Sequence, residues 1–229
     1  MQYEILHRPV FSTLDIRLNA QEQVIARPDS MLSMSTGILI STTISQTGKK
    51  PGWWSGVKSV AGGQSFFTAV FTAKRDDQQL TLAPQDYGDI LTLTPEGENG
   101  YFLARGSYLA HLGDCQLALK YGGMKGFMAK TGLFFLHATG AGSLFCQTRG
   151  AILEKRLEDG ENFVIDNRYI VAFSDTVQYQ LVKATTSAKD SLVSGEGLVN
   201  RYTGPGIVYY QTRAKPPTSF FGVLLSSAT

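Results

Sequence analysis

Apolar and polar residues alternate with a period of two through most of the 229-residue chain. Leu14, Ile16 and Leu18 begin this pattern, and it returns in residues 67–73 and 169–173. Successive side chains of a strand point to opposite faces, so a period of two is typical of strands with one buried face. Many short strands with glycine-containing turns between them predict an all-β sandwich or barrel-like fold.

The pattern occurs in three diverged copies. The segment that begins at Leu18 superimposes on the segment that begins at Leu157, a shift of 157 − 18 = 139 residues, and a weaker copy lies between them. One such unit cannot bury its own apolar face, so the copies must pack together; the alternative is chance similarity among alternating sequences. We therefore predict one domain, 1–229, with tandem β-units at about 1–45, 64–121 and 132–185 and a closing segment at 186–229.

Signals for helices are scarce. Residues 122–132 and 187–199 could each hold one short helical turn, although glycines weaken both predictions. Residues 139–143 contain a GxG motif, but strand-like residues follow it. The helix N-terminus that holds a phosphate in nucleotide-binding folds is therefore missing, and we interpret this segment as a hairpin turn.

Charged residues make up only 17 % of the chain, below the roughly 25 % that is typical of soluble domains. Such a surface tends to be covered by other copies of the chain, and we expect a homo-oligomer, a trimer or a small ring. The formal net charge of +2 is too small to predict nucleic-acid binding. The N-terminus resembles neither a signal nor a transit peptide, and no run approaches the roughly 20 apolar residues of a membrane span. We expect a cytoplasmic protein, or one peripheral to a membrane.

The residue types that carry most enzyme chemistry show no catalytic or metal-binding spacing. Cys115 and Cys146 lie in apolar runs, which favours two buried free thiols over a disulfide. The three histidines, His7, His111 and His137, lack the spacing of a metal site. The sequence thus predicts neither a metal nor another cofactor.

No motif of a known enzyme class occurs in the chain. It has no nucleophile elbow, no phosphate-binding loop, and no metalloprotease or kinase signature. Glu22 and Glu161 could be imagined as a carboxylate pair, but they occupy equivalent turns of two repeats. We interpret them as structural residues, and we predict that the protein is not an enzyme.

Both tryptophans lie side by side in a segment rich in glycine, proline and lysine. Such a loop can contact a membrane surface, a protein partner or single-stranded nucleic acid. The alternative is that the rings fold back over an open end of the β-core. The residues of this possible contact loop are Lys49, Lys50, Trp53, Trp54 and Lys58.

Several segments together resemble one family over nearly the whole chain. They are the opening β-unit, residues 62–67, 134–142 and 157–173, and the closing 195–213, which contains a GPG and a QTR motif. This pattern resembles the altered-inheritance-of-mitochondria family. The residues most characteristic of it are Gly204, Pro205, Gly206, Gln211 and Arg213.

The resemblance implies a fold similar to the tryptophan RNA-binding attenuation protein, of the double-stranded β-helix class, in which β-sandwich units associate side by side. For mitochondrial members it implies a role in inner-membrane organisation, but it carries no catalytic residues. The residue types themselves predict that Pro205 and its flanking glycines form a sharp turn before a closing strand.

Our leading hypothesis is a non-enzymatic oligomeric β-scaffold that organises partners and could lie at a membrane surface. The alternative is a small-molecule binding module with a pocket between repeats. An RNA-binding protein is less favoured because of the weak net charge, and an enzyme of unrecognised type is the remaining hypothesis.

Overall fold

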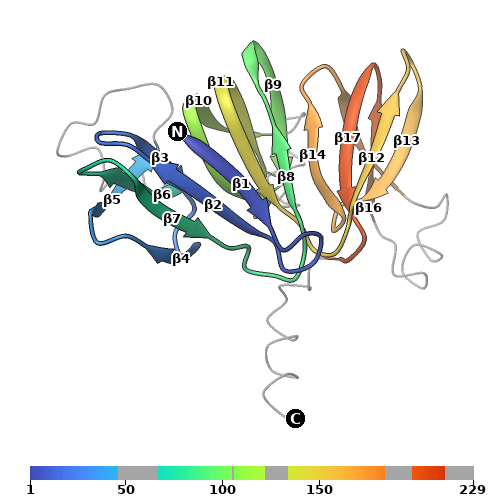
Figure 1. Cartoon of the computed structure of the whole chain (residues 1–229). Helices are drawn as coiled ribbons and strands as arrows, with labels where there is room; N and C mark the ends of the chain where they lie inside the picture. The colour runs from blue at the N-terminus through green and yellow to red at the C-terminus, as the bar shows by residue number, and fades with distance from the viewer. Residues whose placement is uncertain (46–65, 105, 122–133, 184–197, 215–229) are drawn as a thin grey trace.

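The computed structural model describes residues 1–45, 66–104, 106–121, 134–183 and 198–214. All the regular elements in these ranges are β-strands, which confirms the all-β prediction. Figure 1 shows them as twisted antiparallel sheets that follow one another from left to right and pack in a sandwich-like arrangement. The described part of the chain contains no helix long and apolar enough to cross a membrane.

Seven strands come from the first part of the chain. Four of them form one sheet in the order β1-β2-β7-β4, and the other three, β3, β6 and β5, complete one end of a ten-stranded sheet. Their bounds are β1 (Gln2–Leu6), β2 (Thr13–Leu18), β3 (Gln23–Ala26), β4 (Met31–Met34), β5 (Ile38–Ser45), β6 (Phe66–Ala73) and β7 (Gln78–Leu82).

The remaining strands complete the ten-stranded sheet and form a third sheet. The large sheet has the order β12-β17-β14-β9-β11-β10-β3-β6-β5, with β8 paired to β11, and the small sheet has the order β13-β16-β15. Their bounds are β8 (Ile90–Leu93), β9 (Glu96–Ala104), β10 (Tyr108–Tyr121), β11 (Phe134–Gln147), β12 (Ile152–Leu157), β13 (Asn162–Asp166), β14 (Ile170–Ser174), β15 (Gln178–Lys183), β16 (Leu198–Thr203) and β17 (Gly206–Gln211).

Three hydrophobic clusters stabilise these sheets. The first contains the alternating residues of β2, where Leu14 and Ile16 are fully buried. The second is centred on β9, β10 and β11. The third is aromatic, and the Phe173 ring lies 5.1 to 5.2 Å from the rings of Phe135 and Tyr202. Period-two alternation therefore does select the buried face of these strands.

The GxG segment 139–143 is not a hairpin turn, so that interpretation is wrong. It lies inside β11, which pairs with β10 over almost their whole lengths. Gly140 and Gly142 have φ values of +95° and +147°, and Gly113 opposite them has +79°. A Cβ atom on Gly140 would lie 2.2 Å from the carbonyl oxygen of Asp114. The glycines thus let two long strands bend while their backbones stay in close contact.

Neither candidate helix is found in the described residues. Residues 122–132 lie outside them, as do 187–197. The last two residues of the second candidate, Leu198 and Val199, belong to β16. There the helical prediction is wrong, because pairing with β13 and β15 determines the backbone conformation.

Strand bounds recur with the spacing of the predicted repeat. Adding 139 to the bounds of β2 gives 152–157, which are the bounds of β12. The same shift carries β3 and β4 onto residues of β13 and β14. These coincidences agree with the predicted correspondence between the first and third copies, and the middle copy stays a prediction. Residues 198–211 of the predicted closing segment pair with β12 to β15, so they lie within the sheets of the third unit.

Candidate functional site

Three loops meet side by side at the lower end of the sheets in Figure 1. They are residues 7–12, 83–89 and 148–151, which we call the three-loop junction. Gly88 forms parallel bridges with Phe11 on one side and with Gly150 on the other. A Cβ atom on Gly88 would lie 2.0 Å from the carbonyl oxygen of Thr148. Only glycine at this position lets the three backbones approach so closely.

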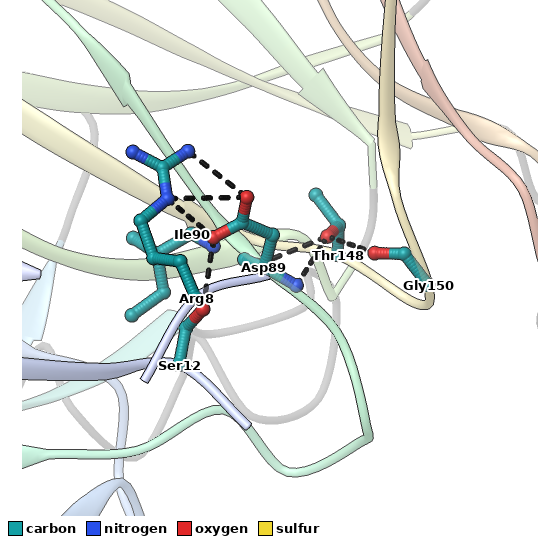
Figure 2. A network of polar contacts seen from close by, with 6 residues as sticks. All are labelled: Arg8, Ser12, Asp89, Ile90, Thr148 and Gly150. Carbon is teal, nitrogen blue, oxygen red and sulfur yellow. Dashed lines mark hydrogen bonds and ion pairs between the residues drawn. The ribbon is translucent and has the colours of Figure 1, made fainter. Parts of the chain in front are cut away.

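A buried carboxylate ties the first two loops together (Figure 2). Asp89 is only 6 % exposed. Its carboxylate accepts hydrogen bonds from the Nε and Nη2 atoms of Arg8, both at 2.9 Å, and from the Ser12 hydroxyl at 2.8 Å. It also accepts one from the backbone N–H of Ile90, at 2.8 Å. A buried charge needs this number of donors, so the network is a strong structural constraint on both loops.

Thr148 joins the third loop to the same carboxylate-bearing segment. Its hydroxyl oxygen accepts a hydrogen bond from the backbone N–H of Asp89 at 3.0 Å. The hydroxyl also lies 3.0 Å from the carbonyl oxygen of Asp89 and 3.2 Å from that of Gly150, to which it donates. All three loops are therefore held by one continuous set of polar contacts, as Figure 2 shows.

The threonine contact recurs once more along the chain. The sequence Gln-Thr-Arg occurs at 147–149 and again at 211–213, a spacing of 211 − 147 = 64. The Thr212 hydroxyl oxygen accepts from the backbone N–H of Ala151 at 3.0 Å, as Thr148 accepts from that of Asp89. The Gln-Thr-Arg at 147–149 is therefore a sequence signal for this site. A prediction based on the closing copy alone does not find it.

Two loops of the junction carry aromatic side chains that are exposed to solvent. Phe11 is 67 % exposed and Tyr87 is 78 % exposed. Their ring centroids are 5.7 Å apart, with an interplanar angle of 76°. The backbones beneath them are fixed, because Phe11 bridges Gly88 and the carbonyl oxygen of Tyr87 accepts from Gly150 N–H at 2.9 Å. We call Phe11 and Tyr87 the aromatic pair.

The charges around the aromatic pair are largely neutralised. Arg8 forms its ion pair with Asp89, and Arg149 forms one with Asp86. Arg27 keeps its charge, and its Nη2 atom donates to the side-chain oxygen of Gln85 at 2.5 Å. The junction therefore presents apolar area without a strong field of either sign.

Glu22 and Glu161 have matching structural roles in two turns. The Glu22 carboxylate accepts from the backbone N–H of Asn19 at 2.8 Å, and the Glu161 carboxylate accepts from that of Glu158 at 2.9 Å. Both donors precede their glutamate by three residues. The pKa of the Glu22 carboxyl is lowered chiefly by its hydrogen bond from the N-terminal ammonium group and then by the one from Asn19. The pKa of the Glu161 carboxyl is lowered chiefly by its hydrogen bond from Lys155 and then by the one from Glu158. These contacts support the interpretation of both glutamates as structural residues.

The predicted contact loop lies outside the described residues, since Lys49, Lys50, Trp53, Trp54 and Lys58 all fall between 46 and 65. Cys115 and Cys146 are both free thiols, as expected, but the predicted burial is confirmed only for Cys146. Cys146 is fully buried and burial raises its pKa, whereas Cys115 is partly exposed.

The three histidines lie in separate places, and the described residues contain no cluster of three His, Cys, Asp or Glu side chains suited to a metal ion. His137 lies 3.4 Å from the Asp175 carboxylate and stacks on the Phe102 ring. His111 is buried, and its Nδ1 atom lies 2.8 Å from the Tyr108 hydroxyl.

The hydrogen bonds of Tyr108 determine the tautomer of His111. The hydroxyl donates to the carbonyl oxygen of Ile25 at 2.9 Å, so its oxygen accepts from the N–H at Nδ1 of His111. Nε2 is then unprotonated, and it is buried without a hydrogen-bond partner. This environment disfavours the charged imidazolium, and burial lowers the pKa of His111 to about 4.

We predict that His111 makes the protein less stable in mild acid. Its ordinary pKa is 6.5 and its pKa in the folded chain is about 4, so the unfolded chain binds the extra proton between these values. The free energy of unfolding should fall as the pH decreases from about 6.5 to about 4, by roughly 3 kcal/mol from this residue. The measurement is urea unfolding of wild type and His111→Gln across this range.

The quantity to compare is the difference in free energy of unfolding between wild type and His111→Gln. Other titrating groups are present in both proteins and cancel in this difference, so its change with pH reports His111. His7→Asn is the matched control, since His7 is exposed and Asn tolerates its φ of 58°. A wild-type profile parallel to that of His111→Gln would contradict the prediction.

Comparison with known proteins gives one family. Residues 3–213 match the description "Mitochondrial biogenesis AIM24", a range that includes all three loops of the junction. The chain belongs to the mitochondrial biogenesis AIM24 family. The family resemblance predicted from the sequence is thereby confirmed.

Relatives of this AIM24 chain occur in Streptococcus pyogenes. An uncharacterized protein of that species is 30 % identical over 217 residues, which cover 93 % of this chain and 86 % of the relative. A crystal structure of a protein from the same species is similar to this chain with a TM-score of 0.74 and 27 % identity, and the match covers 100 % of this chain and 99 % of that one.

The residues that suggested the AIM24 family form a turn and a bridge. The Gly204-Pro205 peptide is cis, and Gly206 has a φ of +145° at the start of β17. The buried Gln211 side chain accepts from the backbone N–H of Arg149 at 2.8 Å, and the exposed Arg213 donates its backbone N–H to the carbonyl oxygen of Arg149 at 3.3 Å. These contacts support the structural interpretation of the motif.

Proposed function

We propose that this member of the AIM24 family is a non-enzymatic interaction protein that binds an uncharged, apolar segment of a protein partner through the aromatic pair. The observation that carries the proposal is two largely exposed rings on backbones that a buried network holds in place. Rigid aromatic side chains lose little conformational entropy on binding, and they dominate the free energy of many interfaces.

The chemistry of the junction supports binding rather than catalysis. A general base needs a lone pair that can reach a substrate. The Asp89 carboxylate is buried and accepts hydrogen bonds from Arg8, Ser12 and Ile90. Its oxygen atoms are therefore engaged by donors of the protein itself and are poorly placed to take a proton from a substrate.

The paired charges favour a protein partner over an anionic membrane. Attraction to acidic lipid relies on lysine or arginine side chains whose charge is not neutralised nearby. Here Arg8 and Arg149 each form an ion pair with an aspartate of the neighbouring loop. An apolar protein segment gains from contact with Phe11 and Tyr87 and needs no opposite charge.

We predict that replacing both rings weakens binding without unfolding the protein. The probe is a display library of random twelve-residue peptides, selected on the wild-type protein. Selected peptides should be apolar and nearly neutral, and they should bind the double variant Phe11→Ser, Tyr87→Ser at least about tenfold more weakly. The free energy of unfolding should change by less than about 1 kcal/mol, because both side chains are exposed.

Val164→Ser is the matched control, since Val164 is 53 % exposed on β13, away from the junction. It should leave peptide binding unchanged. Selected peptides that bind the double variant as tightly as wild type would rule out the aromatic pair as the contact. Binding to anionic vesicles that disappears both at high salt and in the double variant would instead indicate a membrane surface.

A further inference from the structure

The outer strand β5 has one edge that no other described strand pairs with, and it exposes an apolar side chain on each face. Among the described strands it pairs with β6 alone, at one end of the ten-stranded sheet. Leu39 and Ile40 follow each other, so their side chains point to opposite faces, yet they are 53 % and 47 % exposed. The core therefore covers neither face of this strand at these positions.

The strand before it in the chain is similarly exposed. All four residues of β4 are exposed, and Leu32 reaches 61 %. β4 is an outer strand of the four-stranded sheet, and residues 35–37 connect it to β5. We call the exposed apolar side chains of these two strands the apolar edge; they are Met31, Leu32, Met34, Leu39 and Ile40.

The apolar edge lacks the charged residues that most other outer strands have. Native sheets prevent edge-to-edge association with charged side chains on their outer strands. The outer strands β1, β12, β13 and β15 each contain a charged residue, and β12 contains Glu154, Lys155 and Arg156 in succession. The short β8, which pairs with β11 alone, contains none, but its residues are buried or half-buried. β4 and β5 contain none. This difference distinguishes one end of the large sheet from the other, as Figure 1 shows with β5 at the left and β12 towards the right.

We infer that the apolar edge is the site where a second copy of this chain docks, with β5 pairing antiparallel to β5 of the other copy. An eight-residue outer strand is complementary to itself in this arrangement, which generates a closed two-fold dimer. Neither β4 nor β5 contains a charged residue, so no like charges within these two strands oppose the pairing, and a charged partner would find no ion pair on them.

The dimer uses a surface different from the aromatic pair. Phe11 lies between β1 and β2 and Tyr87 between β7 and β8, whereas the apolar edge lies on β4 and β5. The two contacts are therefore tested by different variants, and either can fail alone. Phe11→Ser with Tyr87→Ser should leave the dimer intact.

The first test is the molar mass in solution, measured by sedimentation over a range of protein concentrations. The wild-type chain has a mass of 25.0 kDa and should approach twice this value as the concentration rises. Leu39→Lys with Ile40→Lys should raise the dimer dissociation constant at least about tenfold. Leu153→Lys is the matched control, because Leu153 is a 39 % exposed leucine on the opposite outer strand β12; it should dimerise like wild type.

A second measurement covers the case in which the lysine variant fails to fold. Ser41→Cys places a thiol on an exposed position of β5, and a short bis-maleimide should link two copies through it. Thr94→Cys, also exposed but between β8 and β9, should not be linked in this way. A wild-type mass of 25.0 kDa at every concentration, a dimer that Leu153→Lys alone disrupts, or no cross-link through Ser41→Cys would each overturn the inference.

Discussion

Replacing Asp89 by alanine should lower the free energy of unfolding by about 3 to 5 kcal/mol. The carboxylate is buried and accepts from Arg8, Ser12 and the backbone N–H of Ile90. Its removal leaves a buried hydroxyl and a buried N–H without their acceptor, and it leaves a cavity between the loops. Urea unfolding at neutral pH measures this change, and for a chain of this length the melting temperature should fall by roughly 6 to 20 °C.

Two variants separate the buried network from an ordinary ion pair. Asp89→Asn keeps the shape of the side chain and one acceptor oxygen. Its free energy of unfolding should therefore lie between that of wild type and that of Asp89→Ala. Asp77→Asn removes the charge that pairs with Arg17 in an exposed ion pair, tolerates the φ of 53° at this position, and should cost less than about 1 kcal/mol. If Asp89→Ala were no more destabilising than Asp77→Asn, the network would not be what holds the junction.

The Asp89 variant also connects stability with the proposed function. The aromatic pair is useful as a contact only while the loops that carry it stay fixed. Asp89→Ala should therefore weaken peptide binding even under conditions where the protein remains folded. Phe11 and Tyr87 themselves are unchanged in this variant, so a loss of affinity would show that the network positions them.

Replacing Gly142 by alanine should cost more than about 4 kcal/mol, or prevent folding at 37 °C. Gly142 has a φ of +147°, and a Cβ atom there would lie 2.0 Å from the carbonyl oxygen of Leu112. That oxygen belongs to the neighbouring strand β10, so it cannot move aside without breaking the pairing of β10 and β11. Thermal unfolding followed by circular dichroism is the measurement.

Gly160→Ala is the matched control for backbone strain alone. Gly160 also has a positive φ, +70°, but an added Cβ atom would meet nothing within 4 Å. Its replacement should cost only about 1 to 2 kcal/mol. Equal costs for the two variants would mean that conformational strain, and not the close contact of β10 with β11, explains the glycine at 142.

A chain with both proposed surfaces would act as a paired scaffold. Two copies joined at the apolar edge would present two aromatic pairs to partners. A partner with two binding segments would then bind more tightly than one with a single segment, because its second contact is intramolecular. This arrangement is consistent with the hypothesis of an oligomeric scaffold. It adds to that hypothesis a specific contact, the pairing of β5 with β5 of a second copy.

The sequence by itself determined the β-strand character of the chain and the correspondence of residues 18–34 with residues 157–173. Period two reports which face of a strand is buried, and this local property held for Leu14 and Ile16 in β2. The shift of 139 residues predicted equivalent turns for Glu22 and Glu161, and their hydrogen bonds agree with it. The family pattern was likewise readable from the order of residues alone.

Only the tertiary structure decided where distant residues meet. Arg8, Asp89 and Thr148 are 81 and 59 residues apart along the chain, and no local pattern reports that three loops converge. The GxG segment was misread because glycines at positive φ serve both tight turns and closely packed strands, and only strand pairing distinguishes them. Phe11 and Tyr87 read as ordinary aromatics of a β-protein, because exposure is a property of the packed fold and is not encoded by residue type.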